Sequence, residues 1–352
     1  MLTIGVDFSK RSSVYSVLNN DGQRLKRFKV PNDPKMIDQF FSLLPKEPKT
    51  LAMEATRNWG LYYETVNPYV DEFLLGHPLK MKAITMSETK NDQNDADMIA
   101  KLAYSGFLPK AHVASSDTRE LRSLLRLRVF WVRQRVAIRN QVQTLIDRNI
   151  WPVQRPKSFK SPFCQRGLKW LEGLELPSRE RFILEQCLLS FKELSQKIKA
   201  LEDFIQKEAL DLEGLDHLRT VPNFQRSRVH LYTVLLEIDG IQRFPKAKSL
   251  CLYAGLVPRE YSSGDKHHTG RLVRQANTFL RTAILESVFG AIRQDKALKA
   301  YYQSVKERAG SGPAIIATAR KLCLSIYHVL KEKRAYIYQE SRMADTGPLP
   351  EA

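Results

Sequence analysis

The 352-residue chain carries 56 Lys and Arg residues against 38 Asp and Glu, which gives a formal net charge of +18 at pH 7. Its length predicts two or three domains, each with room for a normal hydrophobic core. The positive charge predicts a polyanionic partner, most commonly nucleic acid, and an anionic membrane surface is the weaker alternative. The chain contains no run of the roughly 18 apolar residues that a membrane span needs. Because it starts in a strand-like segment rather than a signal peptide, we expect a cytoplasmic protein.

The cysteines indicate neither a zinc site nor a disulfide framework. They stand far apart, without a CxxC pair, at Cys164, Cys187, Cys251 and Cys323. The adjacent His267 and His268 have no third ligand nearby in the sequence and do not indicate a metal site by themselves. A metal site therefore has to be sought among the carboxylates.

The first hundred residues alternate strand and helix patterns. Three strand-like runs come first, at residues 2–7, 13–18 and 24–30, and an Asp-Gly turn signal separates the last two. A helix, a strand, a helix, a strand and a helix follow, at residues 34–44, 50–54, 61–70, 73–75 and from 92 onward. An antiparallel meander extended by parallel strands with crossover helices forms a mixed sheet covered by helices. This order predicts a ribonuclease H-like α/β domain.

The middle of the chain changes to a helical period. One long basic helix is predicted from about residue 116 to 149, and a proline-rich loop or hinge over residues 151–162 follows it. Apolar residues between Cys187 and Ile205 alternate steps of four and three, which predicts a coiled-coil arm or a helical hairpin. From Leu215 the chain reads as mainly helical, with breaks at proline and glycine.

These patterns predict four segments. They are an α/β catalytic domain at 1–115, a long basic helix and coiled-coil arm at 116–210, a mainly α domain that bears a serine at 211–340, and a disordered tail at 341–352. The expected fold class is therefore α/β plus α.

Four acids stand where a mixed sheet and its helices direct side chains toward one pocket. Asp7 and Glu54 each end an apolar, strand-like run, whereas Asp92 and Asp95 are three residues apart and so share one helical face. Carboxylates from separate elements suit a pair of Mg²⁺ ions roughly 3.5–4 Å apart, which serve phosphoryl transfer on nucleic acid. Spacing alone also fits a plain alternative, in which the four are ordinary surface acids and Asp92 is the N-cap of a helix.

A second candidate site is the glycine-containing segment 261–271, which presents hydroxyl groups among cations. A serine in such a loop needs a base or a metal to activate its hydroxyl, and cations to stabilise the phosphorane. From the residues alone, the segment fits a phosphate-binding loop, a nucleophile or an ordinary turn.

The long basic helix is a third candidate, and its plain alternative is a solvated face over a helical core. Because acids are few there, contact with nucleic-acid phosphates is favoured, without readout of base sequence. The expected nucleic-acid-binding residues, with two from the serine segment and one just after it, are Arg119, Arg122, Arg126, Arg133, Arg139, Lys266, Arg271 and Arg274.

Taken together, the motifs resemble the bacterial insertion-sequence transposases of the one-ten family, which are related to the Piv-type DNA invertases. The N-terminal motifs are Gly5-Val6-Asp7-Phe8-Ser9-Lys10, Met53-Glu54-Ala55-Thr56 and Lys90-Asn91-Asp92-Gln93-Asn94-Asp95-Ala96. The C-terminal motifs are Phe244, Tyr253-Ala254-Gly255-Leu256-Val257-Pro258-Arg259, Ser263-Gly264 and Asn277 through Leu280-Arg281. They follow the family's order over nearly the whole chain, and the joint match is more specific than any single motif.

The resemblance implies a role for each site. Asp7, Glu54, Asp92 and Asp95 would form an acid tetrad on a RuvC-like domain that binds Mg²⁺ or Mn²⁺. Ser263 would be the nucleophile that forms a covalent phosphoserine link to DNA, with Ser262 as the fallback. The family also implies a structured noncoding guide RNA from the same element and a homo-oligomer, a dimer or tetramer, with composite active sites.

The resulting prediction is a DNA transposase or site-specific recombinase that cuts and rejoins DNA. The first alternative is a metal-dependent, structure-selective nuclease that resembles Holliday-junction resolvases, activates water and forms no covalent intermediate. The second is a non-enzymatic RNA- or DNA-binding protein on a degenerate nuclease fold.

Overall fold

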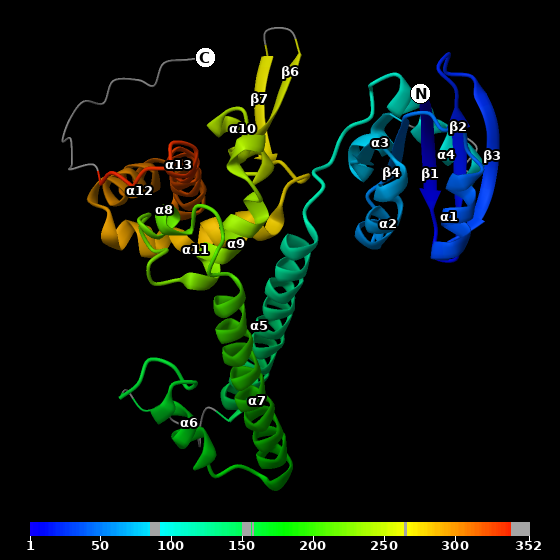
Figure 1. Cartoon of the computed structure of the whole chain (residues 1–352). Helices are drawn as coiled ribbons and strands as arrows, with labels where there is room; N and C mark the ends of the chain where they lie inside the picture. The colour runs from blue at the N-terminus through cyan, green and yellow to red at the C-terminus, as the bar shows by residue number, and fades with distance from the viewer. Residues whose placement is uncertain (85–91, 150–155, 157, 264–265, 339–352) are drawn as a thin grey trace. The chain divides into compact units, whose positions relative to one another are not determined.

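The computed structural model describes residues 1–84, 92–149, 156, 158–263 and 266–338 (Figure 1). The chain forms two compact units, Met1–Ser116 and Asp117–Ala352. The predicted tail at 341–352 and half of the predicted loop at 151–162 lie outside the described residues. Among the described helices, none combines the length and the apolar content that a membrane span requires.

The first unit is built on one five-stranded mixed sheet. Its strands are β1 (Leu2–Phe8), β2 (Ser12–Leu18), β3 (Arg24–Pro31), β4 (Lys49–Glu54) and β5 (Glu72–Gly76), in the order β3-β2-β1-β4-β5. β1, β2 and β3 pair antiparallel, whereas β4 and β5 run parallel to β1. The predicted mixed sheet, with a meander extended by parallel strands, is confirmed.

Helices cover both faces of this sheet. The helices are α1 (Pro34–Ser42), α2 (Trp59–Val66) with the short η1 (Asn67–Tyr69), α3 (Pro78–Ile84) and α4 (Asp92–Tyr104). Phe40 of α1 and Tyr62 of α2 pack with Leu51 of β4 on one face. Ile99 of α4 packs with Ala52 of β4 on the other face. Helix α3 was not predicted from the sequence.

A glycine in β1 lets α4 lie directly on the sheet. A Cβ atom built at Gly5 would come within 2.3 Å of the Ala100 nitrogen and of the Ala96 carbonyl oxygen. Both contacts are with helix backbone, which cannot rotate away as a side chain can. Gly5 therefore sets the closest approach between α4 and the strand that carries Asp7.

The substitution Gly5→Ala is expected to destabilise the protein, because the added methyl group forces α4 away from β1. Overpacking of this kind typically costs about 1–3 kcal/mol. Urea unfolding of the full chain measures the loss. Gly312→Ala is the control, since a Cβ at Gly312 meets nothing within 4 Å. Equal stability of Gly5→Ala and the control would contradict the direct packing of helix on strand.

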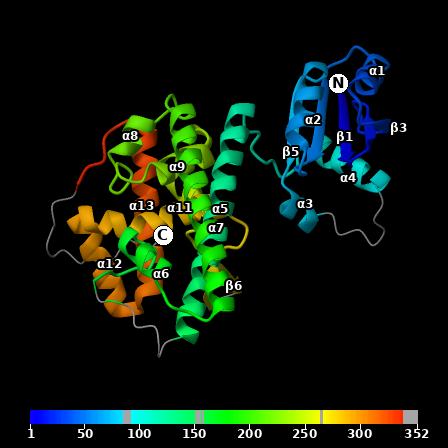
Figure 2. The ribbon, with the colours of Figure 1, turned by 90° about the horizontal axis from the view of Figure 1, so that it is seen from below.

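Two long antiparallel helices form the arm of the second unit. They are α5 (Ser116–Arg148) and α7 (Ser178–Glu208), which lie side by side in both Figure 1 and Figure 2. Arg128 of α5 contacts Glu202 of α7 at 2.6 Å, and Asn149 just after α5 contacts Glu180 near the start of α7 at 2.6 Å. The pairing is that of a helical hairpin, with α6 (Gln165–Glu172) between its helices. Coiled-coil packing stays a prediction.

The rest of the second unit is a helical core. Its helices are α8 (Leu215–Arg219), α9 (Arg228–Ile238), η2 (Ile241–Arg243), α10 (Ala247–Tyr253), α11 (Thr278–Gln294), α12 (Lys296–Ala309) and α13 (Ser311–Lys331). Leu231, Leu250, Ile284 and Leu322 come from four of these helices, and each is fully buried in one common cluster. The C-terminal core is therefore mainly α, as the sequence predicts.

The serine segment forms a β-hairpin, so the prediction of a loop there was wrong. Strands β6 (Pro258–Ser263) and β7 (Lys266–Leu272) pair antiparallel, with Ser263 opposite Lys266. The dipeptide Gly264-Asp265, which lies outside the described residues, stands between the two strands and is a sequence signal for a two-residue hairpin connection. A glycine fits both a phosphate-binding loop and an ordinary turn, so by itself it did not predict the strands on either side.

Candidate functional site

Asp7 and Glu54 lie on the same face of the sheet, at the same edge. They stand near the carboxyl ends of β1 and β4, which are parallel neighbours. Adjacent strands lie about 4.8 Å apart, and residues two positions apart share a face. Asp7 therefore shares the face of Gly5, which meets α4, and Glu54 shares that of Ala52, which packs with Ile99 of α4. Both carboxylates belong to the face that α4 covers.

The direction of α4 brings its first turn to this edge. At the other end of the helix, the Tyr104 hydroxyl donates to the Asn20 carbonyl at 3.1 Å. Asn20 lies in the turn after β2, beside the start of β1, because the last residue of β2 pairs with Thr3. The helix thus runs antiparallel to β1. Its first turn, which contains Asp92 and Asp95, lies toward the carboxyl end of β1, where Asp7 stands.

Asp97, the third acid of α4, has a different use. Arg24 Nη1 donates to one of its carboxylate oxygens at 2.6 Å, and Arg27 Nε donates to the other at 3.1 Å. Burial raises the pKa of Asp97, but the hydrogen bonds from Arg27 and Arg24 outweigh it and lower the pKa to about 2. Asp97 therefore stays ionised and connects α4 to β3. Its role is structural and differs from the metal binding predicted for Asp92 and Asp95.

The acids at the carboxyl edge are of the chemical type that a hard divalent cation takes as ligands. Asp7, Glu54 and Asp95 are half-buried, and carboxylate oxygens are the ligands that Mg²⁺ prefers. The side chain of Asp92 lies outside the described residues. Among the side chains that are described, no three His, Cys, Asp or Glu residues are close enough together to hold a metal ion.

Two buried polar atoms beside Glu54 have no partner within the described part of the chain. They are Oγ1 of Thr56, two residues after Glu54, and Nδ1 of His77. His77 directly follows Gly76, which pairs with Glu54. An unsatisfied buried polar group costs about 1–3 kcal/mol, and a bound ion or water is a common explanation for it. These two atoms favour a polar occupant at this edge. The sequence motifs include Thr56 without assigning it a role, and they do not include His77.

The two candidate nucleophiles lie in the second unit, whereas the four acids lie in the first. Ser262 and Ser263 are the last two residues of β6, opposite His267 and Lys266 of β7. Their side chains, and that of Lys266, lie outside the described residues. The backbone puts Ser263 beside the turn of the hairpin, at the position farthest from its root.

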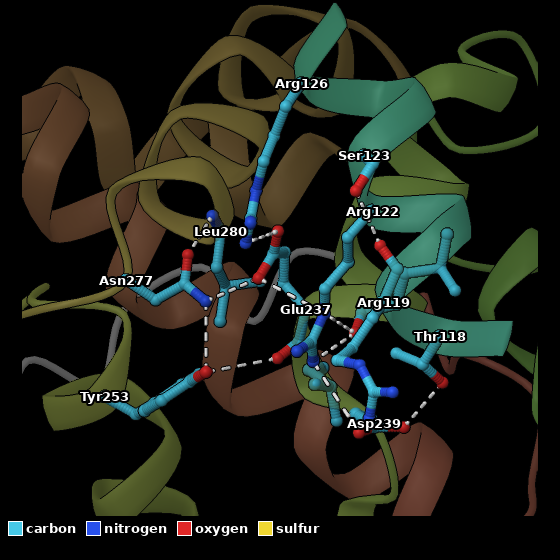
Figure 3. A network of polar contacts seen from close by, with 12 residues as sticks. Thr118, Arg119, Arg122, Ser123, Arg126, Glu237, Asp239, Tyr253, Asn277 and Leu280 are labelled. Carbon is cyan, nitrogen blue, oxygen red and sulfur yellow. Dashed lines mark hydrogen bonds and ion pairs between the residues drawn. The ribbon is translucent and has the colours of Figure 1, made fainter. Parts of the chain in front are cut away.

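The predicted basic residues divide into two groups. Arg133, Arg139, Arg271 and Arg274 are exposed, whereas Arg119 is half-buried. The side chain of Arg122 is only 12% exposed, and it faces Glu237 at 3.6 Å and Asp239 at 3.7 Å (Figure 3). Arg126 faces Glu237 at 3.7 Å. Arg122 therefore serves the core of its own unit, and its predicted contact with nucleic acid stays untested.

A ribonuclease H-like mixed sheet with acids at its carboxyl edge, in a chain of net charge +18, is typical of enzymes that process nucleic acid. Residues 4–150 match the model of the DEDD transposase domain of the IS110 type, which is described as a transposase. Residues 216–303 match the model described as the transposase IS116/IS110/IS902 family.

Three curated relatives are similar over most of their length. The transposase for insertion sequence element IS1111A of Coxiella burnetii is 24% identical over 296 residues, 81% of this chain and 79% of the relative. The probable family 20 transposase of Pseudomonas aeruginosa is 22% identical over 343 residues, which cover 95% of this chain and 98% of the relative. The transposase for insertion sequence element IS1328 of Yersinia enterocolitica is 23% identical over 283 residues, which cover 80% of this chain and 81% of the relative.

The first family match covers the first compact unit and continues through α5, and the second match lies within the second unit, in the order that the sequence motifs predict. The chain belongs to the IS116/IS110/IS902 family of transposases. The resemblance found from the motifs is thereby confirmed.

Proposed function

We propose that this transposase cuts and rejoins DNA with a divalent-metal acid tetrad and a serine nucleophile. The observation that carries the proposal is the convergence of Asp7, Glu54 and the first turn of α4 at one edge of the sheet. In the same chain, the second family match contains the hairpin with Ser263. In this proposal the N-terminal part supplies the metal ligands, and the C-terminal part supplies the attacking hydroxyl.

The proposed metal ligands are Asp7, Glu54, Asp92 and Asp95. Bound Mg²⁺ or Mn²⁺ would supply positive charge to the oxygens that attack and leave during phosphoryl transfer. The carboxylates hold this charge at a fixed edge, because Gly5 and Ala96 lock α4 against β1. Thr56 and His77 support the proposal, since each has a buried polar atom without a partner in the described part of the chain, close in sequence to the ends of β4 and β5.

In the proposed reaction, Ser263 Oγ attacks the scissile phosphorus. The new Oγ–P bond forms as the P–O bond to the leaving deoxyribose oxygen breaks, the serine proton passes to a base, and the leaving oxygen takes up a proton. A DNA hydroxyl that attacks the phosphoserine reverses these changes and frees the serine. The bond energy is conserved in the adduct, so rejoining needs no external energy source.

Exposed cations of the second unit are the proposed phosphate contacts. They are Arg133 and Arg139 on α5, and Arg271 and Arg274 at the end of the hairpin. Neutralised phosphates release counterions, so binding should weaken as salt rises. Such contacts hold DNA or RNA without reading its sequence.

We further propose that a structured noncoding RNA of the same element guides the choice of DNA, and that the protein works as a homo-oligomer. Both proposals rest on the resemblance to the family. RNA guidance is chemically reasonable, because base pairing would carry a sequence specificity that the side chains need not encode. Sequencing of the RNA that co-purifies with the protein tests guidance. A discrete RNA with loops complementary to the element's ends is expected, and random fragments would contradict the proposal.

The competing function is a nuclease that uses the same acids to activate water, and the separate compact unit that holds them makes it a definite candidate. The full chain is incubated with its co-purified RNA, Mg²⁺ and labelled DNA of its own element. The protein is then denatured, so that only covalently attached DNA stays with it. The proposal predicts DNA that is covalently attached to protein. Cleaved DNA without attached protein would favour the nuclease.

A further inference from the structure

The root of the serine hairpin is held by one arginine of α11. Arg281 Nε donates to the Ala254 carbonyl at 3.1 Å, and its Nη2 donates to the Val273 carbonyl at 2.7 Å. These carbonyls lie on either side of the hairpin, whose strands close where the Val273 nitrogen donates to the Val257 carbonyl at 3.1 Å. Gly255 accommodates the guanidinium, because a Cβ there would lie 2.1 Å from Nη2.

Asn277, just before α11, adds three contacts of defined direction (Figure 3). Its Oδ1 accepts from the Leu280 nitrogen at 3.0 Å, which caps the helix. Its Nδ2 donates to Glu237 Oε2 at 2.8 Å and to the Tyr253 hydroxyl at 3.0 Å. Because a carboxylate accepts only, the amide orientation is fixed. The residue that begins α11 is thus connected to Glu237.

Glu237 is buried, with 2% of its surface exposed, at the end of α9. Its carboxylate faces two cations of α5, Arg122 Nε at 3.6 Å and Arg126 Nη2 at 3.7 Å. Arg122 also donates to the Leu236 carbonyl, at 2.9 and 2.7 Å. A buried carboxylate needs such partners, because an unpaired buried charge is strongly unfavourable.

These contacts form one connected path from α5 to the hairpin root, and Glu237 lies at its centre. One oxygen of Glu237 faces Arg126, and the other accepts from Asn277, so both neighbours meet a single rigid group. Arg126 also lies over the Phe279 ring of α11, 5.1 Å from its centroid. An apolar cluster would bury similar area, but it would not fix angles in this way.

We propose that Glu237 is a positioning residue for Ser263: through Asn277 it sets the direction of the β6–β7 hairpin relative to α5. The proposal rests on the proposed function, since it matters for catalysis only if the hairpin carries the nucleophile. Glu237 would act through the hairpin root, without touching the DNA. A path of contacts is not itself coupling, so the test has to measure the interaction between residues.

The test exchanges donor and acceptor between Glu237 and Asn277. Glu237→Gln and Asn277→Asp each disturb the pair, and the double variant restores one hydrogen bond in the opposite sense with the same net charge. Aspartate keeps the helix cap. We expect each single variant to slow adduct formation at saturating DNA by at least about 10-fold, with DNA affinity changed by less than about threefold. The double variant should recover to within about threefold of wild type.

Hydrogen exchange of the full chain gives a second readout that does not depend on chemistry at Ser263. The Val273 amide at the hairpin root should exchange at least about 10-fold faster in Glu237→Gln, because local opening becomes easier. Glu202→Gln is the control: it removes the negative charge from another partner of α5, the carboxylate that accepts from Arg128 at 2.6 Å, away from the hairpin. It should leave both readouts unchanged.

Two results would overturn the positioning role: single variants with wild-type adduct rates and exchange, or a double variant as slow as the product of the single effects. If a single variant fails to fold, Tyr253→Phe removes one acceptor of Asn277 and should show the same changes at smaller size. If Ser263→Ala still forms the adduct, the proposed function fails, yet exchange at Val273 still decides the positioning claim.

Discussion

Replacing Ser263 by alanine is expected to abolish the denaturant-resistant link between protein and DNA, with a loss of at least about 10³-fold in its rate of formation. The reason is that no other atom of the side chain can form the ester bond to phosphorus. Labelled DNA that migrates with the protein on a denaturing gel measures the adduct. DNA binding before denaturation should be unchanged.

Ser262→Ala is the matched control for this experiment. The two serines are adjacent in β6 and carry the same hydroxyl, so the pair differs only in position. Because Ser263 is the proposed nucleophile, Ser262→Ala should keep most of the adduct. A normal adduct in the variant that lacks both hydroxyls would end the serine role.

The second large effect is expected from Asp7→Asn. An amide in place of the carboxylate removes one negative charge and one strong oxygen ligand, so Mn²⁺ or Mg²⁺ should bind more weakly. We expect DNA cleavage to fall by at least about 10³-fold at low metal concentration, and calorimetric titration of Mn²⁺ without DNA to show a weaker site. The titration makes this test independent of activity.

Asp97→Asn is the control for the metal site. Asp97 is also an acid of α4, but its partners are Arg24 and Arg27. Its removal should lower stability and leave Mn²⁺ affinity unchanged. Unaltered Mn²⁺ binding and cleavage in Asp7→Asn would instead favour a binding protein on a degenerate nuclease fold.

The edge with the acids could be predicted from sequence because its signals are local. Asp7 and Glu54 each end an apolar run, and such runs predict strands without any knowledge of distant contacts. Which face the acids share could not be predicted. It follows from the approach of α4 to Gly5, and a glycine in a strand does not by itself reveal what lies against it.

The buried position of Arg122 depends on contacts between distant residues. The cations of α5 carry the same sequence pattern whether they face phosphates or acids of the protein, so the buried position of Arg122 was not predictable from its helix alone. A signal for its partner does exist. Glu237 is the one acid within the apolar run Val234-Leu235-Leu236-Glu237-Ile238, and a buried acid in such a run needs a cation.

The hairpin shows the limit of a single residue as a signal. Gly264 by itself fits a loop, whereas the residues before Gly264 and after Asp265 pair as β6 and β7. The same glycine followed by Asp265 fits a two-residue connection between strands. Whether the segment is a loop or a hairpin is decided by the strands on both sides and not by the glycine.

Mapping of the covalent adduct by tandem mass spectrometry tests the central claim most directly. The full chain is reacted with DNA of its own element, RNA and Mg²⁺, then digested with protease and nuclease. The account predicts a nucleotide phosphate on the peptide of β6, attached at Ser263. A nucleotide on any other residue, or cleaved DNA with no modified peptide, would contradict it.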